Sequence, residues 1–217
     1  MENNRHAPVI ADSAQSHDHP RNRVAASLSR LSRTKANGRV GLVCDTVIGF
    51  AFVWFAKSSY DVSVMSLTVA LLTGLALFTF IEYAFHRWLF HGSLDSLRRG
   101  HWQHHLFPHG DDSLPFFVPP LAMTVVAVVL ATAMPGGVAL SFVGGLASGY
   151  ALYGISHILI HSRQFSHSGL RRWAASHHVH HYHPDKNFGV TSPLWDVVLG
   201  TRYVSKRPSK DEHRRRG

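Results

Sequence analysis

The stretch "VSVMSLTVALLTGLALFTFIEYAF", residues 62–85, decides the fold that this sequence predicts. It contains no charged residue before Glu82. A helix rises about 1.5 Å per residue, so roughly 20 apolar residues cross the apolar core of a bilayer. Residues 62–85 therefore predict a membrane-spanning helix. This helix leads directly into His86, where a histidine-rich region begins.

Three further apolar stretches occur along the chain. They cover residues 40–56, 115–134 and 136–160. The first of these is marginal in length and is interrupted by Asp45. A soluble bundle of unusually apolar helices is the alternative, but four near-spanning runs in 217 residues are hard to cover with water-facing surface. The sequence therefore predicts an all-α integral membrane protein with about four transmembrane helices.

Glycines and prolines predict details of these helices. Gly145 and Gly149 are four residues apart, a spacing that lets a neighbouring helix approach closely. Pro119 and Pro120 suit the start of a helix better than its middle, because proline lacks a backbone N–H. We therefore expect a close helix crossing at the two glycines and a helix start at the two prolines.

The basic residues are segregated from the apolar ones and predict the topology. The chain has 22 Lys and Arg against 13 Asp and Glu, a formal net charge of +9. The connections "KSSYD" (57–61) and "MPGG" (134–137) are short and nearly neutral, whereas the other connections and both termini are rich in arginine. By the positive-inside rule, these arginine-rich segments lie in the cytoplasm. We expect a multi-pass protein of the bacterial inner membrane or the endoplasmic reticulum, whose basic residues contact lipid headgroups rather than nucleic acid.

The two ends of the chain differ in composition from its apolar centre. Residues 1–39 are polar and basic and lack the apolar region of a secretory signal, so we expect a disordered arm there. We expect residues 40–204 to form the membrane-embedded domain and residues 205–217 to form a basic tail. Cys44 is the only cysteine, which excludes an internal disulfide framework.

Histidines gather in four clusters, all in segments that this topology places in the cytoplasm. The clusters are "HRWLFH" (His86 and His91), "HWQHH" (His101, His104 and His105), "HILIH" (His157 and His161) and, within "SHHVHHYHP", the set His177, His180 and His181. Neutral imidazole is the commonest metal-binding side chain. Ten such side chains exceed the needs of one tetrahedral zinc ion, whereas two metal ions with open positions could use most of them. We therefore expect a cytoplasmic helical cap that carries a histidine-rich dimetal site.

The spacing within each cluster predicts how its imidazoles point. In the two His-x-x-His-His clusters and in "HILIH", all members lie on one helical face and can converge on a single point. The five-residue step in "HRWLFH" makes about 140° of rotation in an ideal helix. One histidine of that cluster should therefore lie at or beyond the helix end, with Gly92 as a stop.

The clusters have two other possible interpretations. Exposed polar histidines would be the simplest explanation for one residue, but not for four clusters at ligand spacing. A histidine-rich metal buffer would carry low-complexity tracts, whereas each cluster here adjoins an ordered apolar stretch. The clusters therefore favour metal ligands over both alternatives.

The segment "SHHVHHYHP", residues 176–184, contains more histidines than one site can use. Helical geometry alone does not choose between His178 and His180, since either fits an arc with the two other ligands. The spacing of "HWQHH" favours His180, and Pro184 favours a helix end near His183. Four further histidines lie outside the motif spacing, and we expect surface or supporting roles for them: His109, His167, His178 and His183. Glu82 and Asp196 are candidates to accept the second N–H of a metal-bound histidine, or are ordinary acids.

The order and spacing of the four clusters resemble the fatty acid hydroxylase superfamily, which includes sterol desaturases and sphingolipid fatty acid hydroxylases. The segment "NFGVTSPLWDVVLGT", residues 187–201, is similar to the closing segment of that family. The resemblance implies a non-haem dimetal site, nominally di-iron, that activates O2 and hydroxylates a C–H bond of a fatty acyl chain, sphingolipid or sterol. It implies that the metal ligands, and hence the catalytic residues, are His86, His91, His101, His104, His105, His157, His161, His177, His180 and His181.

The resemblance also implies partners and leaves competing functions open. We expect electrons from a separate donor, cytochrome b5-like or ferredoxin-type, because no cytochrome b5-like domain is evident in the sequence. Zinc competes well for imidazole ligands and can replace iron in purified protein. A lipid desaturase or a carotenoid hydroxylase would use a similar site. The alternative from another class is a membrane metal-binding or transport protein, which should place its ligands near the bilayer midplane.

Overall fold

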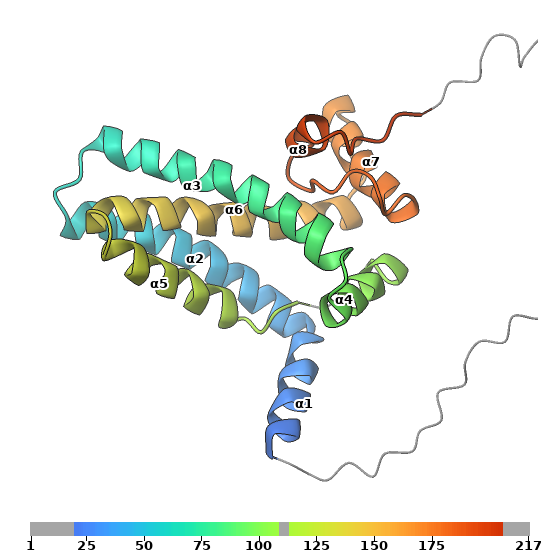
Figure 1. Cartoon of the computed structure of the whole chain (residues 1–217), viewed down its shortest axis with the longest axis horizontal. Coiled ribbons are helices and arrows are strands. Elements are labelled where there is room, and N and C mark those ends of the chain that lie inside the picture. The colour runs from blue at the N-terminus through green and yellow to red at the C-terminus, as the bar shows by residue number, and fades with distance from the viewer. Residues whose placement is uncertain (1–19, 109–112, 206–217) are drawn as a thin grey trace, which may run out of the picture.

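The computed structural model describes residues 20–108 and 113–205, and within these ranges every regular element is helical (Figure 1). The elements are α1 (Pro20–Ser32), α2 (Lys35–Ser59), α3 (Val64–Ala84), the π-helix η1 (Phe85–Phe90), α4 (Asp95–Leu106), α5 (Val118–Ala131), α6 (Gly136–Ser162), α7 (Ser168–Tyr182) and α8 (Leu194–Val198). The predicted all-α class is confirmed for the described residues. His109 and the segment 206–217 lie outside them.

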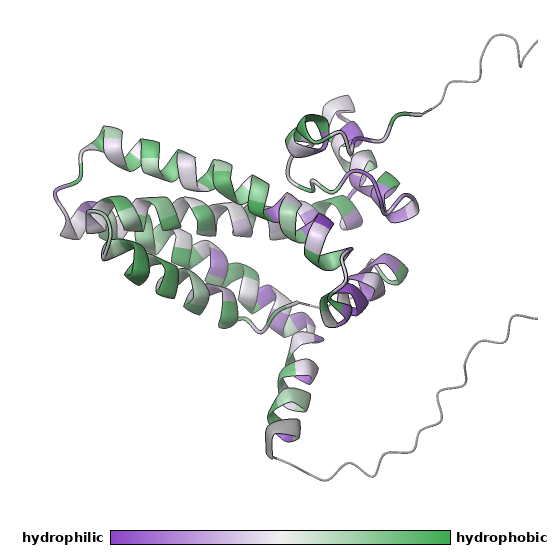
Figure 2. Cartoon of the chain, viewed as in Figure 1, coloured by the Kyte–Doolittle hydropathy of each residue, from purple (hydrophilic) through white to green (hydrophobic). Residues whose placement is uncertain are grey.

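Three helices are long and apolar enough to cross a membrane. They are α2, the continuous helix of α3 and η1, and α6, and Figure 2 shows apolar residues along all three. The fourth predicted span forms only the 14-residue helix α5. At about 1.5 Å per residue, α5 is roughly 21 Å long, which is less than the ~30 Å apolar core of a bilayer. Its two prolines stand at the helix start, as predicted.

Helix α6 is the central element of the bundle, and glycines allow its neighbours to come close. A Cβ added to Gly145 would lie 2.1 Å from the carbonyl oxygen of Leu71 on α3. A Cβ added to Gly74 on α3 would likewise lie 2.0 Å from the carbonyl oxygen of Phe142 on α6. The backbones of α3 and α6 therefore touch, and the predicted close crossing is confirmed.

The two short connections meet at one end of the bundle. The α2–α3 connection contains Tyr60, and Ser63 caps α3 by accepting the backbone N–H of Ser66. The α5–α6 connection leads into Gly136, where a Cβ would lie 2.5 Å from the Tyr60 ring. Helices α4, α7 and α8 lie at the opposite end (Figure 1). All four histidine clusters therefore belong to the end away from these two turns.

The predicted N-terminal arm is partly helical rather than disordered. Residues 20–32 form α1 and Lys35 begins α2, with Thr34 capping that helix through the backbone N–H of Asn37. The buried Asn37 side chain donates to Ser113 Oγ and to the Leu114 carbonyl, each at 2.8 Å. These bonds tie the start of α2 to the chain that leads into α5. Residues 1–19 lie outside the described range.

The chain after α7 folds back across the histidine clusters. Asn187 has a φ of 54°, a left-handed conformation that asparagine tolerates better than most residues. Its backbone N–H donates to the Thr201 carbonyl, and its side chain donates to the Ser176 carbonyl on α7. The Tyr203 N–H donates to Asn187 Oδ1. Asn187 therefore connects the start of the segment that follows α7 both to α7 itself and to the end of that segment at Thr201 and Tyr203.

Candidate metal centre

The end of the second spanning helix is wound more loosely than an α-helix. The Phe85–Phe90 segment is a π-helix, and the His91 N–H donates to the His86 carbonyl at 3.2 Å. This i→i+5 bond brings His91 back over His86, whereas α-helical geometry would separate them by about 140°. His91 caps the π-helix, as the sequence predicted for one histidine of this cluster. The chain then turns at Gly92, where a Cβ would lie 1.9 Å from the Trp88 carbonyl oxygen.

Nine of the ten histidines form two groups whose ring nitrogens converge. Within each group, one nitrogen from every member lies within 4.8 Å of all the others. The first group is His86, His91, His101, His105 and His180, and the second group is His104, His157, His161 and His177. The structure thus unites clusters that are far apart in the sequence.

The two His-x-x-His-His clusters each contribute to both groups. His101 and His105 belong to the first group and His104 to the second, so the predicted convergence of this cluster on one point is wrong. Adjacent helical residues differ by about 100°, which aims His104 and His105 at different centres. The cluster on α7 divides in the same way between His177 and His180. By contrast, "HRWLFH" contributes both of its histidines to the first group, and "HILIH" contributes both of its histidines to the second.

His181 lies between the groups. Its Nε2 is 3.3 Å from Nε2 of His177, and its ring centroid is 4.5 Å from that of His105. Of the histidines expected outside the site, His178 is exposed on α7, with its ring centroid 5.7 Å from that of His161. His167 and His183 are also exposed, and His183 stacks on Tyr203.

Backbone carbonyls determine which nitrogen faces the centre of the first group. His86 Nδ1 lies 2.5 Å from the Phe188 carbonyl oxygen, and His180 Nδ1 lies 2.7 Å from the Lys186 carbonyl oxygen. In each imidazole Nδ1 therefore carries the proton and donates it, which leaves a lone pair on Nε2. Both Nε2 atoms point into the group, 3.0 Å from Nε2 of His101 and of His91 respectively.

The first group fits a transition-metal ion. Lone pairs that converge at 3.0 Å repel one another unless a cation or a proton lies between them. Adjacent ligands at about 90° around an ion, with metal–nitrogen bonds of about 2.1 Å, are themselves roughly 3 Å apart. His105 Nε2 is also 3.0 Å from that of His101. The donor set and its spacing are therefore those of a polyhistidine metal site.

Burial keeps these imidazoles neutral, the form that binds metal. Loss of solvation, followed by repulsion from neighbouring histidines, lowers the pKa of His101 to about 2. Burial lowers the pKa of His180 to about 3 and that of His105 to about 4. The pKa of His104 is also lowered by burial and by the neighbouring His157. At neutral pH the free site therefore holds lone pairs rather than protons.

Among the described residues, the hydrogen bonds of Glu82 and Asp196 go to the backbone and to threonine hydroxyls and not to a histidine, so the predicted role as acceptors of a histidine N–H is not seen. Both are buried, and both accept backbone N–H groups from residues 186–191, here called the closing loop. Glu82 Oε1 accepts from Val190 and Thr191. The carboxylates therefore support the loop whose carbonyls hold His86 and His180. Sequence patterns could not reveal which loop carbonyls hold His86 and His180, since every residue carries a backbone carbonyl.

Long apolar helices that end at two groups of partly buried, converging histidines define a membrane protein with paired polyhistidine sites. The sequence profile of the family described as fatty acid hydroxylase matches residues 71–201 of the chain. The chain belongs to this family and is an enzyme of the hydroxylase class.

Two curated relatives illustrate the similarity. The chain is 30% identical to dihydroceramide fatty acyl 2-hydroxylase FAH1 of Arabidopsis thaliana, over 74% of this chain and 72% of the relative. It is 35% identical to fatty acid 2-hydroxylase of Rattus norvegicus, over 59% of this chain but only 38% of the rat protein. The chain thus spans most of the plant protein and well under half of the rat one.

A solved structure shares the fold. The structure of full-length scs7p, in which only the hydroxylase domain is visible, aligns with a TM-score of 0.68 at 24% identity. The alignment covers 83% of this chain and 71% of that one. The helical arrangement described above is therefore also found in a solved structure.

Proposed function

We propose that the chain hydroxylates a C–H bond of a fatty acyl chain, free or within a sphingolipid, with O2 and external electrons at two metal ions. The observation that carries the proposal is the convergence of nine histidines into two groups where the spanning helices end. The closest ring centroids of the two groups, those of His101 and His104 and those of His177 and His180, are 5.8 Å apart, so the two centres can act on one substrate. The names of the relatives support a fatty acyl or ceramide substrate.

The stoichiometry of the overall reaction defines the chemistry that the site must support. A C–H bond and O2 become a C–OH group and water, with two electrons and two protons taken up. Metal ions, when bound, supply the O2 chemistry. The chain's own residues hold the ions through His86, His180 and the other members of the groups, keep the imidazoles neutral, and exclude water by burial. Because α3 and α6 run from the bilayer into the site, an acyl chain can reach it without leaving apolar surroundings.

We also propose a native metal, an electron donor and a membrane orientation. Iron is the expected native metal, and zinc is an expected replacement in purified protein, since both bind imidazole. Electrons come from a separate cytochrome b5-like or ferredoxin-type donor. The histidine groups and both termini face the cytoplasm, in keeping with the arginine-rich connections. The relatives' names further suggest carbon 2 of the acyl chain as the position of attack.

A lipid comparison tests the proposal. Cells that express the wild-type chain should accumulate a 2-hydroxylated acyl lipid that is missing from cells without the gene. Cells that express His86→Ala at the same level in the membrane are the matched control and should lack the product. The product should also vanish under strict anaerobiosis. A new double bond in place of a hydroxyl group would indicate a desaturase, and full turnover without O2 would contradict the oxygenase.

A membrane metal-binding or transport protein remains the second candidate from another class. Transporters bind their ions near the bilayer midplane. Here the histidine groups occupy helix ends, and α4 and α7, which supply five of their members, are not candidate spans. The positions therefore favour the enzyme. Metal uptake that depends on the histidines, with unchanged lipids, would favour the transporter instead.

A further inference from the structure

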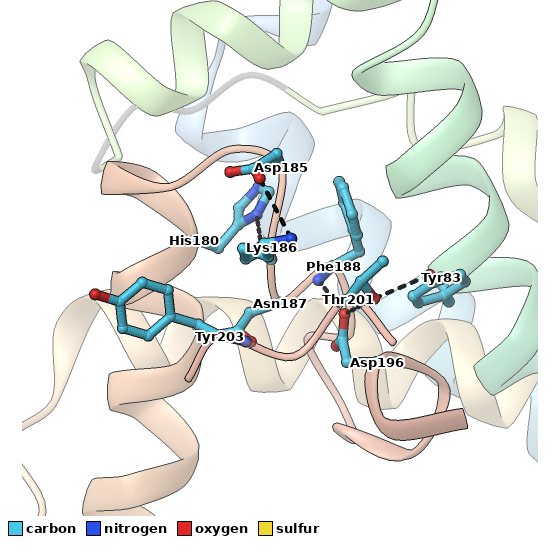
Figure 3. Close-up of polar contacts among 9 residues, drawn as sticks. All are labelled: Tyr83, His180, Asp185, Lys186, Asn187, Phe188, Asp196, Thr201 and Tyr203. Atoms are coloured by element: carbon cyan, nitrogen blue, oxygen red, sulfur yellow. Dashed lines mark hydrogen bonds and ion pairs between the residues drawn. The ribbon is translucent and has the colours of Figure 1, made fainter. Parts of the chain in front are cut away.

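The closing loop presents two backbone carbonyls to two members of the first group. The Phe188 carbonyl accepts from His86, and the Lys186 carbonyl accepts from His180. Figure 3 shows the bond between His180 and Lys186. These histidines come from η1 and α7, so a single loop orients rings from two distant parts of the chain. The orientation of both rings depends on the position of the loop backbone.

Asp196 of α8 holds this backbone with both of its oxygens. Its Oδ1 accepts the Phe188 N–H and its Oδ2 accepts the Gly189 N–H, each at 2.8 Å. The carboxylate is almost fully buried, with 1% of the residue exposed. A Cβ on Gly189 would lie 3.1 Å from Oδ2 and 2.1 Å from the Ser192 carbonyl oxygen, so the loop fits tightly over the carboxylate.

A directed series of hydrogen bonds ends on the same carboxylate. Thr201 Oγ1 donates to Asp196 Oδ1 at 2.7 Å, so its hydroxyl proton is not available for Tyr83. The Tyr83 hydroxyl, 3.0 Å from Thr201 Oγ1, is then the donor in that pair (Figure 3). Tyr83 in turn accepts from Arg87 Nη1 at 2.7 Å. The series runs from a guanidinium to a carboxylate. Because all of its hydrogen bonds donate in the same direction, each bond strengthens the next.

We propose that Asp196 is a positioning residue for the first histidine group and acts through the closing loop. The inference rests on the proposed function only in that the group binds a metal ion. Two backbone N–H groups fix the loop on the carboxylate, and the loop's carbonyls fix the Nδ1–H of His86 and of His180. Loss of the carboxylate therefore loosens the metal ligands without touching them.

Glu82 gives an internal contrast, because its hydrogen bonds differ in kind. Both backbone donors, Val190 and Thr191, reach the same oxygen, Oε1, while Oε2 faces only the Thr191 hydroxyl. An amide at this position keeps an oxygen for the two N–H groups, and the hydroxyl can rotate to accept from the NH2. At Asp196 each oxygen accepts a backbone N–H, so an amide must point its NH2 at one of them.

The same isosteric substitution should therefore change metal release at Asp196 and leave it unchanged at Glu82. The experiment loads the purified full-length chain with Co2+ and follows release of the ion to excess chelator. Asp196→Asn should release one of the bound ions roughly 10–100-fold faster than wild type. Glu82→Gln should release its ions at the wild-type rate. The ion affected by Asp196→Asn should be the one that His86→Ala fails to bind.

The outcomes separate this inference from misfolding and from the proposed function. Wild-type release rates in Asp196→Asn, or equal acceleration in both amide variants, would overturn it. Equal acceleration of every ion in Asp196→Asn would indicate general loosening and would also overturn it. If Asp196→Asn does not fold, Thr201→Val removes the third bond to the carboxylate, together with the Tyr83 bond to the same hydroxyl, and leaves both loop N–H bonds in place. It should accelerate release of the same ion to a smaller degree. Metal release needs no turnover, so absence of a hydroxylated lipid would refute the function and leave this result standing.

Discussion

His178 and His180 are two residues apart on α7 and have opposite surroundings. His180 is fully buried, with its Nε2 3.0 Å from that of His91, whereas His178 is exposed. We expect His180→Ala and His181→Ala to abolish turnover and lower the metal content, with a loss beyond the roughly 10–100-fold typical of supporting residues. His178→Ala should retain most of both. Metal analysis and turnover of the three variants check this, and an inactive His178→Ala beside an active His180→Ala would mean that the ligand assignment is wrong.

The half-buried histidines should make the metal-free protein sensitive to acid. Burial lowers the pKa of His91, His105 and His181 from 6.5 to about 4. As the pH falls below about 6.5, these imidazoles become protonated in the unfolded chain but stay neutral in the folded one. The free energy of unfolding therefore decreases until the pH nears 4. The Tm of the metal-free chain should therefore be lower at pH 5.5 than at pH 7.5. A Tm that stays constant or rises on acidification would contradict the lowered pKa values.

At the scale of helices, the contact between α3 and α6 leaves no room for a side chain. The Cβ of Gly145→Ala would meet the Leu71 backbone, which cannot move as a side chain can. We expect the substitution to destabilise the bundle by about 1–3 kcal/mol. Gly154→Ala on the same helix is the matched control, because its Cβ would meet only the end of the Leu42 side chain, at 3.3 Å. Thermal unfolding in detergent checks the pair, and equal Tm values would contradict a tight crossing.

The elements also show where sequence analysis succeeds and where it stops. Apolar runs predicted α2, α3 and α6 well, because the length and composition of a span are local properties. The ligand spacing selected histidines that the fold does bring together. The division of "HWQHH" between two centres could not be predicted, since it depends on the placement of partners from η1, α6 and α7. The π-helix in "HRWLFH" was equally hidden, because its extra residue per turn leaves no mark on the apolar pattern.

For the whole molecule, the two ends of the bundle predict a labelling pattern. Ser59 and Ser166 are both exposed, and they belong to opposite ends, the first beside the short turns and the second between α6 and α7. In a Cys44→Ala background, an impermeant thiol reagent added outside intact cells should label Ser59→Cys but not Ser166→Cys. Permeabilised cells are the control and should label both. Labelling of Ser166→Cys in intact cells would place the histidine groups on the other side of the membrane.

The closing loop also affects how the protein is made. His91 and His180 are 89 residues apart, and the loop that orients His180 follows them both. At roughly 5–20 residues per second, a ribosome needs on the order of 5–20 s to pass from one to the other. During that interval the first spanning helices are already synthesised, while the nascent chain offers an incomplete set of ligands. We expect nascent chains stalled before residue 186 to be inserted in the membrane and to carry no tightly bound metal, so that insertion precedes metallation.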